Sequence, residues 1–569
     1  MILDDVLDPR GQVSINTIRL AKRPSPDQLA SGNILFYDNT KLDFCNYAEI
    51  FASIKRHFEA RGIKNLVTCR QTVRGCMTHD LRERARKLAE GGYVAAIVAL
   101  ADMGTSPMTT VLAIELEKAG IPTLLISAPP GDGLAKHVAY YRAGHFCICD
   151  LDIYQASTAA EIAAEVDSNI GYIIDALTLP DDRIEQCARL HPLLDQEPEL
   201  SLGRQLADAA TGLDASQAAA PGLYMDELMG IGEALSIGDG LPFIPPTAER
   251  LSRMEAFCPY CPEDVLIPEA GPSGRDITVR DVMINAIMAG CEPRHLPVVL
   301  AAFQAMRRPE FNFQQAVTTS YNGGKLVLVS GPIADELNIH SGQGCLGPGF
   351  RANATIGRAI NLTILNVCRA YPGKADLGCL ASPAEFTYCF AENRALSPWP
   401  GLNEEYFDAQ TTSVYVLKAE PPTDVVDFLS DTADGLLETI IDSASHLGRM
   451  NAYIPGRIMV VLTPDHARIL QRDGWTKASL RQFLFGNINN PRRKVERRGL
   501  VPVRPEGFLN MDPVPATRHP QDIDLVVAGG RGGHSAIIAS WGLYSDAVMH
   551  PLHLPDGRRA TSIIDFKKQ

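Results

Sequence analysis

One stretch of the chain reads Val94-Ala95-Ala96-Ile97-Val98-Ala99-Leu100-Ala101-Asp102-Met103-Gly104-Thr105-Ser106-Pro107. Its continuous apolar run is typical of a strand that is buried on both faces of a parallel sheet. The polar loop that follows ends in Thr105 and Ser106, either of which can cap a helix, and Pro107 suits the first helical position. The stretch therefore predicts a strand, a loop and a helix in immediate succession.

The same alternation repeats from Asn33 to about Leu179. Short apolar runs predict strands at residues 34–37, 65–68, 94–100, 123–126 and 146–148. Apolar residues at three- and four-residue spacing predict helices at residues 47–60, 79–90, 106–119 and 158–177. Because such crossovers are right-handed, this rhythm predicts an α/β fold with a doubly wound, flavodoxin-like parallel sheet covered on both faces.

We expect four segments: an N-terminal extension at residues 1–32, the parallel-sheet domain at 33–180, a connector at 181–225, and a larger mixed α/β domain at 226–569. Small and polar residues at 214–222 mark the end of the connector. In the larger domain, periodicity predicts helices at residues 279–289, 296–306, 355–367, 433–447 and 464–473. Short apolar runs predict strands at 325–329, 413–417, 458–462 and 523–528.

The loops after the predicted strands of the first domain are polar. Ligands of open parallel sheets bind at the carboxyl ends of the strands, where these loops lie. The substrate ligands that we expect from them are Arg70, Arg74, Gly104, Thr105 and Ser106.

Cys76 lies where the loop after the second predicted strand meets a helix. Arg70 and Arg74 are near enough in sequence to stabilise a thiolate at this position, and His79 could act as its base. The alternative is a buried structural thiol beside an exposed histidine in the first helical turn.

A glycine-rich run, Ser341–Arg358, carries a second candidate thiol, Cys345. Four glycines and a proline leave backbone N–H groups free, and the run then enters a helix N-terminus, which favours an anion and can lower the pKa of a cysteine. We expect Cys345 to be a nucleophile, and the expected substrate ligands beside it are Gly344, Arg351, Asn353 and Arg358. The alternative is a tight structural turn around a buried cysteine.

Two carboxylates flank an apolar segment of the larger domain, Glu385 before it and Glu392 after it. Burial raises the pKa of such groups and suits them to acid–base catalysis, so we expect Glu392 to be catalytic and Asn393 to bind substrate. A structural ion pair is the alternative interpretation of Glu392.

The two histidines that we expect to reach a catalytic site are His340 and His534. His340 directly precedes the glycine-rich run, and His534 lies in a second glycine-rich loop at residues 529–535. That loop is a further candidate anion site or a plain flexible turn; it has neither a dinucleotide-binding fingerprint nor a Walker lysine.

Cys258-Pro259-Tyr260-Cys261 has the spelling of a dithiol redox motif. Such motifs follow a strand and open a helix, whereas here the preceding residues have helical periodicity. The sequence leaves open whether these two thiols are redox-active. No second pair of ligands at close spacing accompanies them, so we expect no metal site.

Bulk composition narrows the function classes. The formal net charge of −14 over 569 residues disfavours nucleic acid as a partner. An odd number of cysteines, 13, fits reduced thiols in the cytoplasm. The N-terminus lacks a signal-peptide layout and no apolar run approaches the ~20 residues that span a bilayer. We expect a cytoplasmic homo-oligomer that takes a small anionic metabolite, with no membrane partner; no motif identifies a cofactor.

The segment Ala101-Asp102-Met103-Gly104-Thr105-Ser106-Pro107-Met108-Thr109-Thr110, followed by Ala113–Thr123, resembles the UGSC family, named for a selenocysteine-or-cysteine, Gly, Ser, Cys motif at this turn. The resemblance covers most of residues 33–180. Met103 stands where the family has selenocysteine or cysteine, and Ser106 where it has the second cysteine. A dithiol mechanism is therefore not carried over to this loop.

The second half is similar to a large domain commonly found with UGSC-type domains. The similarity lies in residues 238–247 and 285–291, in the loop around Cys345, and in residues 527–530. It implies that the two domains act jointly on a small metabolite.

Three hypotheses follow from the sequence. The first is an enzyme that acts on a small anionic metabolite through Cys345 or Cys76 and acid–base residues, with lyase or addition–elimination chemistry preferred. The second is a thiol-based oxidoreductase that uses Cys258 and Cys261 or Cys76. The third is a noncatalytic small-molecule-binding protein whose cysteines are packed in the core.

Overall fold

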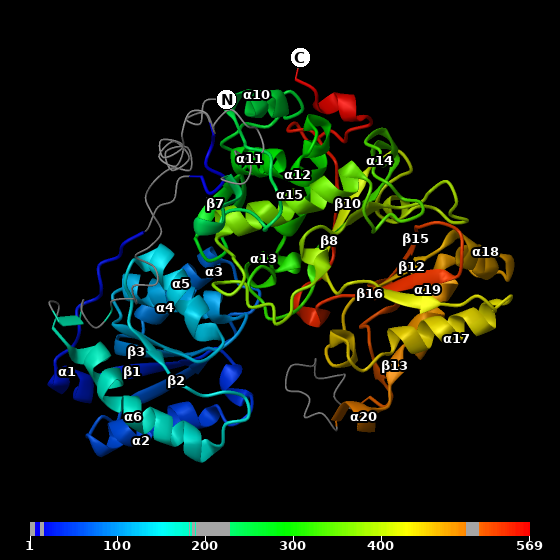
Figure 1. The fold of residues 1–569 in the computed structure, drawn as a ribbon. Helices are drawn as coiled ribbons and strands as arrows, with labels where there is room; N and C mark the ends of the chain where they lie inside the picture. The colour runs from blue at the N-terminus through cyan, green and yellow to red at the C-terminus, as the bar shows by residue number, and fades with distance from the viewer. Residues whose placement is uncertain are drawn as a thin grey trace.

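A computed structural model of the protein describes residues 6–11, 16–180, 183–184, 188, 228–230, 232–496 and 511–568. The expected connector at 181–225 lies outside the described residues, apart from residues 183, 184 and 188. The two halves of the chain lie side by side (Figure 1). No helix in the described part is long and apolar enough to cross a membrane.

The first half contains a five-stranded parallel sheet with the strand order β2-β1-β3-β4-β5. Its strands are β1 (Asn33–Asp38), β2 (Leu66–Arg70), β3 (Tyr93–Ala101), β4 (Thr123–Ser127) and β5 (Ile148–Asp150). This order confirms the predicted doubly wound, flavodoxin-like sheet. The chain runs outward in opposite directions from β1 and β3, so the loops after these strands diverge and leave room for a ligand.

Helices cover both faces of this sheet (Figure 1). One face packs against α2 (Ala48–Ala60) and α6 (Ala159–Thr178), and the other against α3 (Thr78–Ala89), α4 (Ser106–Lys118) and α5 (Gly131–Ala143). A short helix, α1 (Pro26–Ser31), precedes β1. The periodicity predicted all of these except α1 and α5, and α5 begins with Gly131-Asp132-Gly133, which is typical of a loop.

The second half contains two four-stranded sheets. The first has the order β17-β10-β8-β9 and the second the order β11-β16-β12-β15. Their strands are β8 (Gly324–Ser330), β9 (Cys389–Ala391), β10 (Ser413–Ala419), β11 (Thr423–Val426), β12 (Ile458–Leu462), β15 (Ile523–Val527), β16 (His534–Ala539) and β17 (Val548–Pro551). Parallel and antiparallel pairs occur in both sheets, which confirms the mixed α/β prediction.

These sheets and their helices form four layers. The outer face of the first sheet packs against α11 (Val279–Ala289), α12 (Leu296–Met306) and α15 (Arg351–Cys368). The second sheet packs against α17 (Ala433–Ala444), α18 (Pro464–Arg472) and α19 (Lys477–Asn487). The two sheets bury a shared apolar layer between them that includes Leu326, Tyr415 and Val526. Alternate residues of each strand therefore belong to different cores.

Smaller elements complete the second half. They are α10 (Ala248–Glu255), β6 (Val265–Ala270), β7 (Arg275–Thr278), α13 (Phe313–Ala316), α14 (Pro332–Glu336), α16 (Leu402–Tyr406), β13 (Asn489–Asn490), α20 (Arg492–Glu496) and β14 (Val514–Pro515). The antiparallel pair β6–β7 contacts the first half: Arg82 forms an ion pair of 2.7 Å with Glu269.

Gly131 shows how closely the loop after β3 packs on the start of α5. A Cβ at this position would lie 2.4 Å from both the backbone carbonyl carbon of Asp102 and Oγ of Ser106. At Gly133, two residues along the same helix, nothing lies within 4 Å. The two glycines form a matched pair for measuring the rigidity of this loop.

We predict that Gly131→Ala lowers the free energy of unfolding by about 1–3 kcal/mol, because the methyl group forces backbone to move. Gly133→Ala should be neutral or stabilising by about 0.5–1 kcal/mol, because alanine has the lower conformational entropy in the unfolded chain. Urea denaturation followed by circular dichroism measures both. Equal effects of the two substitutions would contradict a rigid loop.

Candidate functional site

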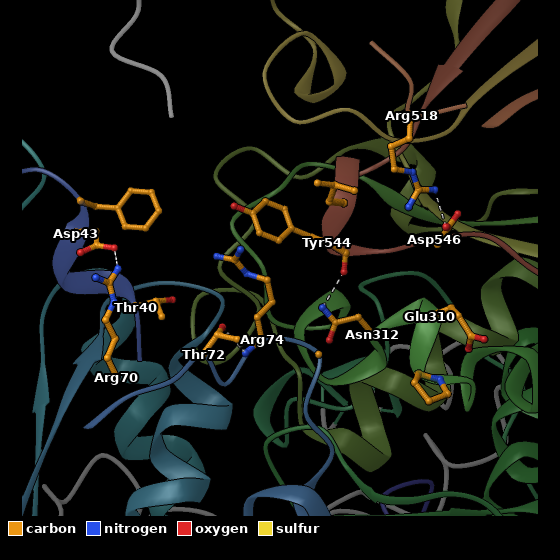
Figure 2. Close-up of a pocket in the computed structure, with 14 residues that line it drawn as sticks. Thr40, Asp43, Arg70, Thr72, Arg74, Glu310, Asn312, Arg518, Tyr544 and Asp546 are labelled. Carbon is orange, nitrogen blue, oxygen red and sulfur yellow. Dashed lines mark hydrogen bonds and ion pairs between the residues drawn. The ribbon is translucent and has the colours of Figure 1, made fainter. Parts of the chain in front are cut away.

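A cavity of about 670 Å³, here called the interdomain cleft, lies between the two halves (Figure 2). On one side it is lined by loops that follow β1 and β2, at the carboxyl edge of the parallel sheet, where ligands of such sheets bind. Its lining residues are Thr40, Asp43, Phe44, Arg70, Thr72, Arg74, Gly75, Pro309, Glu310, Asn312, Arg518, Leu543, Tyr544 and Asp546.

Arg70, the last residue of β2, lies on the wall of the cleft formed by the first half. Its guanidinium pairs with Asp43, and its Nε lies 3.7 Å from a carboxylate oxygen of Asp38 (Figure 2). Asp38 also accepts a hydrogen bond of 2.7 Å from the backbone N–H of Thr40, whose φ of 74° is left-handed. The charge of Arg70 is thus shared with two carboxylates.

Arg74 differs from Arg70 because no described carboxylate forms an ion pair with it. Its guanidinium lies over the ring of Tyr544, 4.3 Å from the ring centroid (Figure 2). Within the described part of the chain, its side chain makes no hydrogen bond or ion pair, and its Nε is buried without a partner. A guanidinium that stacks on an aromatic ring keeps the N–H groups around its own edge available to a ligand.

Hydrogen bonds from Tyr37 and Arg84 hold the loop that carries Arg74 in place. The hydroxyl of Tyr37 donates to the carbonyl of Gln71 at 2.9 Å, and Arg84 donates to the carbonyl of Thr72 at 2.7 Å. Arg74 is therefore positioned by ordered backbone, which limits the entropy that a ligand would cost to bind.

The opposite wall comes from the second half. Asn312 donates to the backbone carbonyl of Tyr544 at 2.8 Å and so fixes the backbone that carries the aromatic ring. Arg518 donates to Asp522 at 2.8 Å and to Asp546 at 2.7 Å. Although burial opposes it, Arg457 and Arg518 keep the pKa of Asp546 below its usual value. Sequence reasoning missed these residues, because no local pattern marks them and only the fold brings them to the cleft.

The loop after β3, with the predicted ligands Gly104, Thr105 and Ser106, does not line the cleft. A Cβ at Gly104 would lie 3.3 Å from Cα of Thr319, so the second half covers this loop. The hydroxyls of Thr105 and Ser106 are buried and find no hydrogen-bond partner among the described residues, and neither caps α4. An ion pair of 3.2 Å between Lys41 and Asp102 joins this loop to the one after β1.

Cys76 lies beside the cleft loop but is held by a different arginine from those expected. Nη2 of Arg84 lies 3.4 Å from its Sγ. Burial raises the pKa of this thiol, and Arg84 only partly opposes that effect. His79 is exposed and lies 3.3 Å from Asp80. This geometry favours the structural interpretation of Cys76.

The structure brings several other predicted residues together around the glycine-rich run. Asn353 accepts a hydrogen bond from the backbone of His340 at 2.8 Å and donates to the carbonyls of His340 and Cys345, at 2.9 and 3.0 Å. Asn393 donates to the carbonyl of Gly529 at 3.3 Å. The predicted ligand Gly344 occupies the turn itself, with a φ of 75°. The side chains of both asparagines are therefore engaged in hydrogen bonds to the backbone.

The two glycine-rich loops also meet each other. Gly342 and Gly529 form a parallel bridge, and the backbone N–H of Gly529 donates to the carbonyl of Ser341 at 2.8 Å. A Cβ at Gly530 would lie 2.7 Å from Cβ of Gln343.

Cys345 lines a separate cavity of about 440 Å³, which includes the apolar or weakly polar residues Leu346, Pro348, Tyr388 and Pro421. None of the lining residues is a lysine, arginine or histidine. Burial raises the pKa of Cys345, although hydrogen bonds from the backbone of Gly529 and Leu346 oppose it. The role of Cys345 as a nucleophile stays a prediction.

The two arginines expected beside Cys345 bind protein groups instead. Arg351 donates to the carbonyl of Gly290 at 2.9 Å, and Arg358 holds the carboxylate of Asp239 with two hydrogen bonds of 2.7 and 2.8 Å. Both guanidinium groups therefore stabilise the fold at the start of α15.

Glu392 is buried at the end of the first sheet. It accepts hydrogen bonds from Ser330 at 2.6 Å and from the backbone of Leu402 at 2.7 Å, and Lys477 lies 3.9 Å away. Burial raises its pKa against the influence of Lys477. These contacts fit the structural ion pair that the sequence left open.

His534 lies on the surface, apart from Cys345. Its Nδ1 is 2.9 Å from a carboxylate oxygen of Asp424, and its ring packs edge-on against Phe428. His340 stacks on Phe350 with ring centroids 3.6 Å apart.

The thiols of the Cys258–Cys261 pair are not activated. Burial raises the pKa of Cys258 to about 11, and a hydrogen bond to Glu263 raises the pKa of the exposed Cys261. Both are free, as are the other described cysteines. No group of three or more His, Cys, Asp or Glu side chains among the described residues could hold a metal ion.

A comparison with protein-family models, curated proteins and solved structures found no match. The geometry of the chain itself therefore carries the functional argument.

We predict that iodoacetamide modifies Cys345 at least about tenfold more slowly than the exposed Cys379 at pH 7.5, because a raised pKa and burial both lower the reactive thiolate. The rate at Cys345 should rise steadily up to and beyond pH 9. Peptide mapping by mass spectrometry after timed quenching gives both rates in one sample. Faster modification of Cys345 than of Cys379 would show an activated thiolate.

Proposed function

We propose that the protein is an enzyme of small-molecule metabolism that binds an anionic substrate in the interdomain cleft. The observation that carries the proposal is the guanidinium of Arg74, which stacks on Tyr544 and makes no hydrogen bond or ion pair with any described residue. An arginine presents paired N–H donors that match carboxylate and phosphate groups in bidentate geometry. The hydroxyls of Thr40 and Thr72 line the same cavity and supply further polar contacts.

The reaction class that we propose is lyase or addition–elimination chemistry. Tyr544 supports it, since its side chain extends toward Arg74 in the cleft (Figure 2). Burial raises the pKa of Tyr544 while Arg74 opposes this, so the phenol is neutral near pH 7 and can donate a proton.

A thiol-based oxidoreductase is the weaker proposal. Each described cysteine with a resolved shift has a pKa above the ordinary value, and burial is the largest cause for all of them except Cys261. Redox-active thiols need the opposite shift. A noncatalytic binding protein would use the same cleft and differs only in the lack of turnover.

The cellular setting belongs to the same proposal. Twelve described cysteines are free, which supports a reducing compartment such as the cytoplasm. We propose further that the chain is related to the UGSC family and that it forms a homo-oligomer.

We predict that Arg74→Met weakens binding of malonate, a small dicarboxylate probe, by at least about tenfold, because the substitution removes a charge-assisted contact. Arg74→Lys should retain part of the affinity. Isothermal titration calorimetry measures all of the affinities. Arg86→Met is the matched control, since Arg86 is an exposed arginine on α3. Equal malonate affinity in the Arg74→Met and Arg86→Met variants would contradict the proposal.

A second prediction distinguishes the interdomain cleft from the loop around Cys345 as the site where the anion binds. Cys345→Ala should leave the malonate affinity within about twofold of wild type, because Cys345 lines a different cavity from Arg74. The same titration measures it, with Arg74→Met as the positive control for loss. Loss of malonate binding in Cys345→Ala, with an unchanged circular dichroism spectrum, would instead place the anion site at the glycine-rich run.

A further inference from the structure

Two buried lysines stand opposite each other in the first sheet of the second half. Lys325 on β8 pairs in register with Lys418 on β10, and they are 5% and 2% exposed. They share the helix-covered face of the sheet with Val327 and Val416, which belong to the apolar core. Like charges at directly opposed positions destabilise a sheet, so this pair needs a compensating negative group.

Lys418 has protein partners. Its Nζ donates to the carbonyl of Gly323 and lies 3.7 Å from a carboxylate oxygen of Glu385. Burial, together with the charge of Lys325, lowers the pKa of Lys418 to about 8. Burial raises the pKa of Glu385 against the influence of both lysines.

Lys325 has no such partner. Within the described part of the chain, no hydrogen bond or ion pair within 4 Å involves its ammonium group. Lys325 influences the pKa of Glu385, but the ion pair that Glu385 forms is with Lys418. A buried ammonium ion whose N–H donors are unused is costly, and a bound carboxylate would use them.

Lys325 lines a cavity of about 330 Å³ between the sheet, α15 and the segment before β9. Ile364, Leu365 and Phe386 give this cavity apolar walls. Asn361, which is 4% exposed, lines it as well, and no residue that the structure describes forms a hydrogen bond with its side-chain oxygen. Apolar walls with a few unsatisfied polar groups are the usual composition of a small-molecule site.

We propose that this cavity binds a small organic acid, whose carboxylate pairs with Lys325 and whose apolar part packs against Ile364, Leu365 and Phe386. A single negative charge fits best, because the carboxylates of Glu385 and Asp376, and that of Asp239 with its partner Arg358, line the same cavity and would repel a dianion or phosphate. Asn361 can accept a hydrogen bond from a donor group on the ligand.

This site is independent of the proposed function. The cavity shares no lining residue with the interdomain cleft, and Lys325 and Arg74 belong to different halves of the chain. Failure of one proposal therefore leaves the other standing.

The test compares benzoate with benzamide, its uncharged isostere, by isothermal titration calorimetry on the full-length protein. Wild type should bind benzoate at least tenfold more tightly than benzamide. Lys325→Met should weaken benzoate binding at least tenfold and leave or raise the melting temperature, since it removes a buried charge that has no direct ion pair among the described residues. Lys87→Met, at an exposed lysine on α3, is the matched control and should bind benzoate as wild type does.

A second variant keeps the test decisive if Lys325→Met fails to fold. Leu365→Trp fills the cavity from its partly buried wall without changing any charge, and it should abolish benzoate binding. The proposal is overturned if wild type shows no saturable benzoate binding, if benzamide binds as tightly, or if a folded Lys325→Met or Leu365→Trp variant binds benzoate like wild type.

Discussion

One buried arginine fixes how the two halves of this protein meet. Arg142, near the end of α5, donates to the carbonyls of Glu269 and Gly271, at 2.9 and 2.8 Å. Burial lowers its pKa to about 10, against the attraction of Glu269 and Glu115. Both residues that supply these carbonyls have left-handed φ values, 46° at Glu269 and 56° at Gly271. A buried cation that depends on two turned carbonyls tolerates little sliding of the halves, so the shape of the cleft depends on this contact.

The sequence predicts a helix or strand well where the spacing of its own apolar residues determines it. In the first half, the period of the apolar residues gives the strands and most helices to within a few residues, because each helix buries one stripe and each central strand is apolar throughout. Helix α5 was not predicted because its first turn contains two glycines and directly follows two prolines. In the second half, the elements could be predicted but not their pairing: β8 pairs with β10 about ninety residues later in the chain, and no local pattern encodes that register.

The candidate site also contains some residues that the sequence could predict and others that it could not. Arg70 and Arg74 line the cleft, as the rule for loops at the carboxyl edge of a parallel sheet led us to expect. Arg351 and Arg358, chosen for their nearness to a thiol, are engaged by backbone carbonyls and carboxylates, which a sequence does not reveal. The pair of Lys325 and Lys418 went unnoticed because each lysine alone resembles the polar end of a strand. Only the register shows that two charges face one another inside the core.

The meeting of the two glycine-rich loops constrains how this protein can vary. Because a methyl group at position 530 would overlap the side chain of Gln343, the available volume at that crossing is shared between the two loops. The contact is with Cβ of Gln343, which every residue except glycine carries, so a side chain at position 530 requires the loop at residue 343 to shift or to lose its own Cβ, although nearly two hundred positions separate the two residues in the chain. Engineering of the loop around the Cys345 thiol must therefore redesign both segments at once.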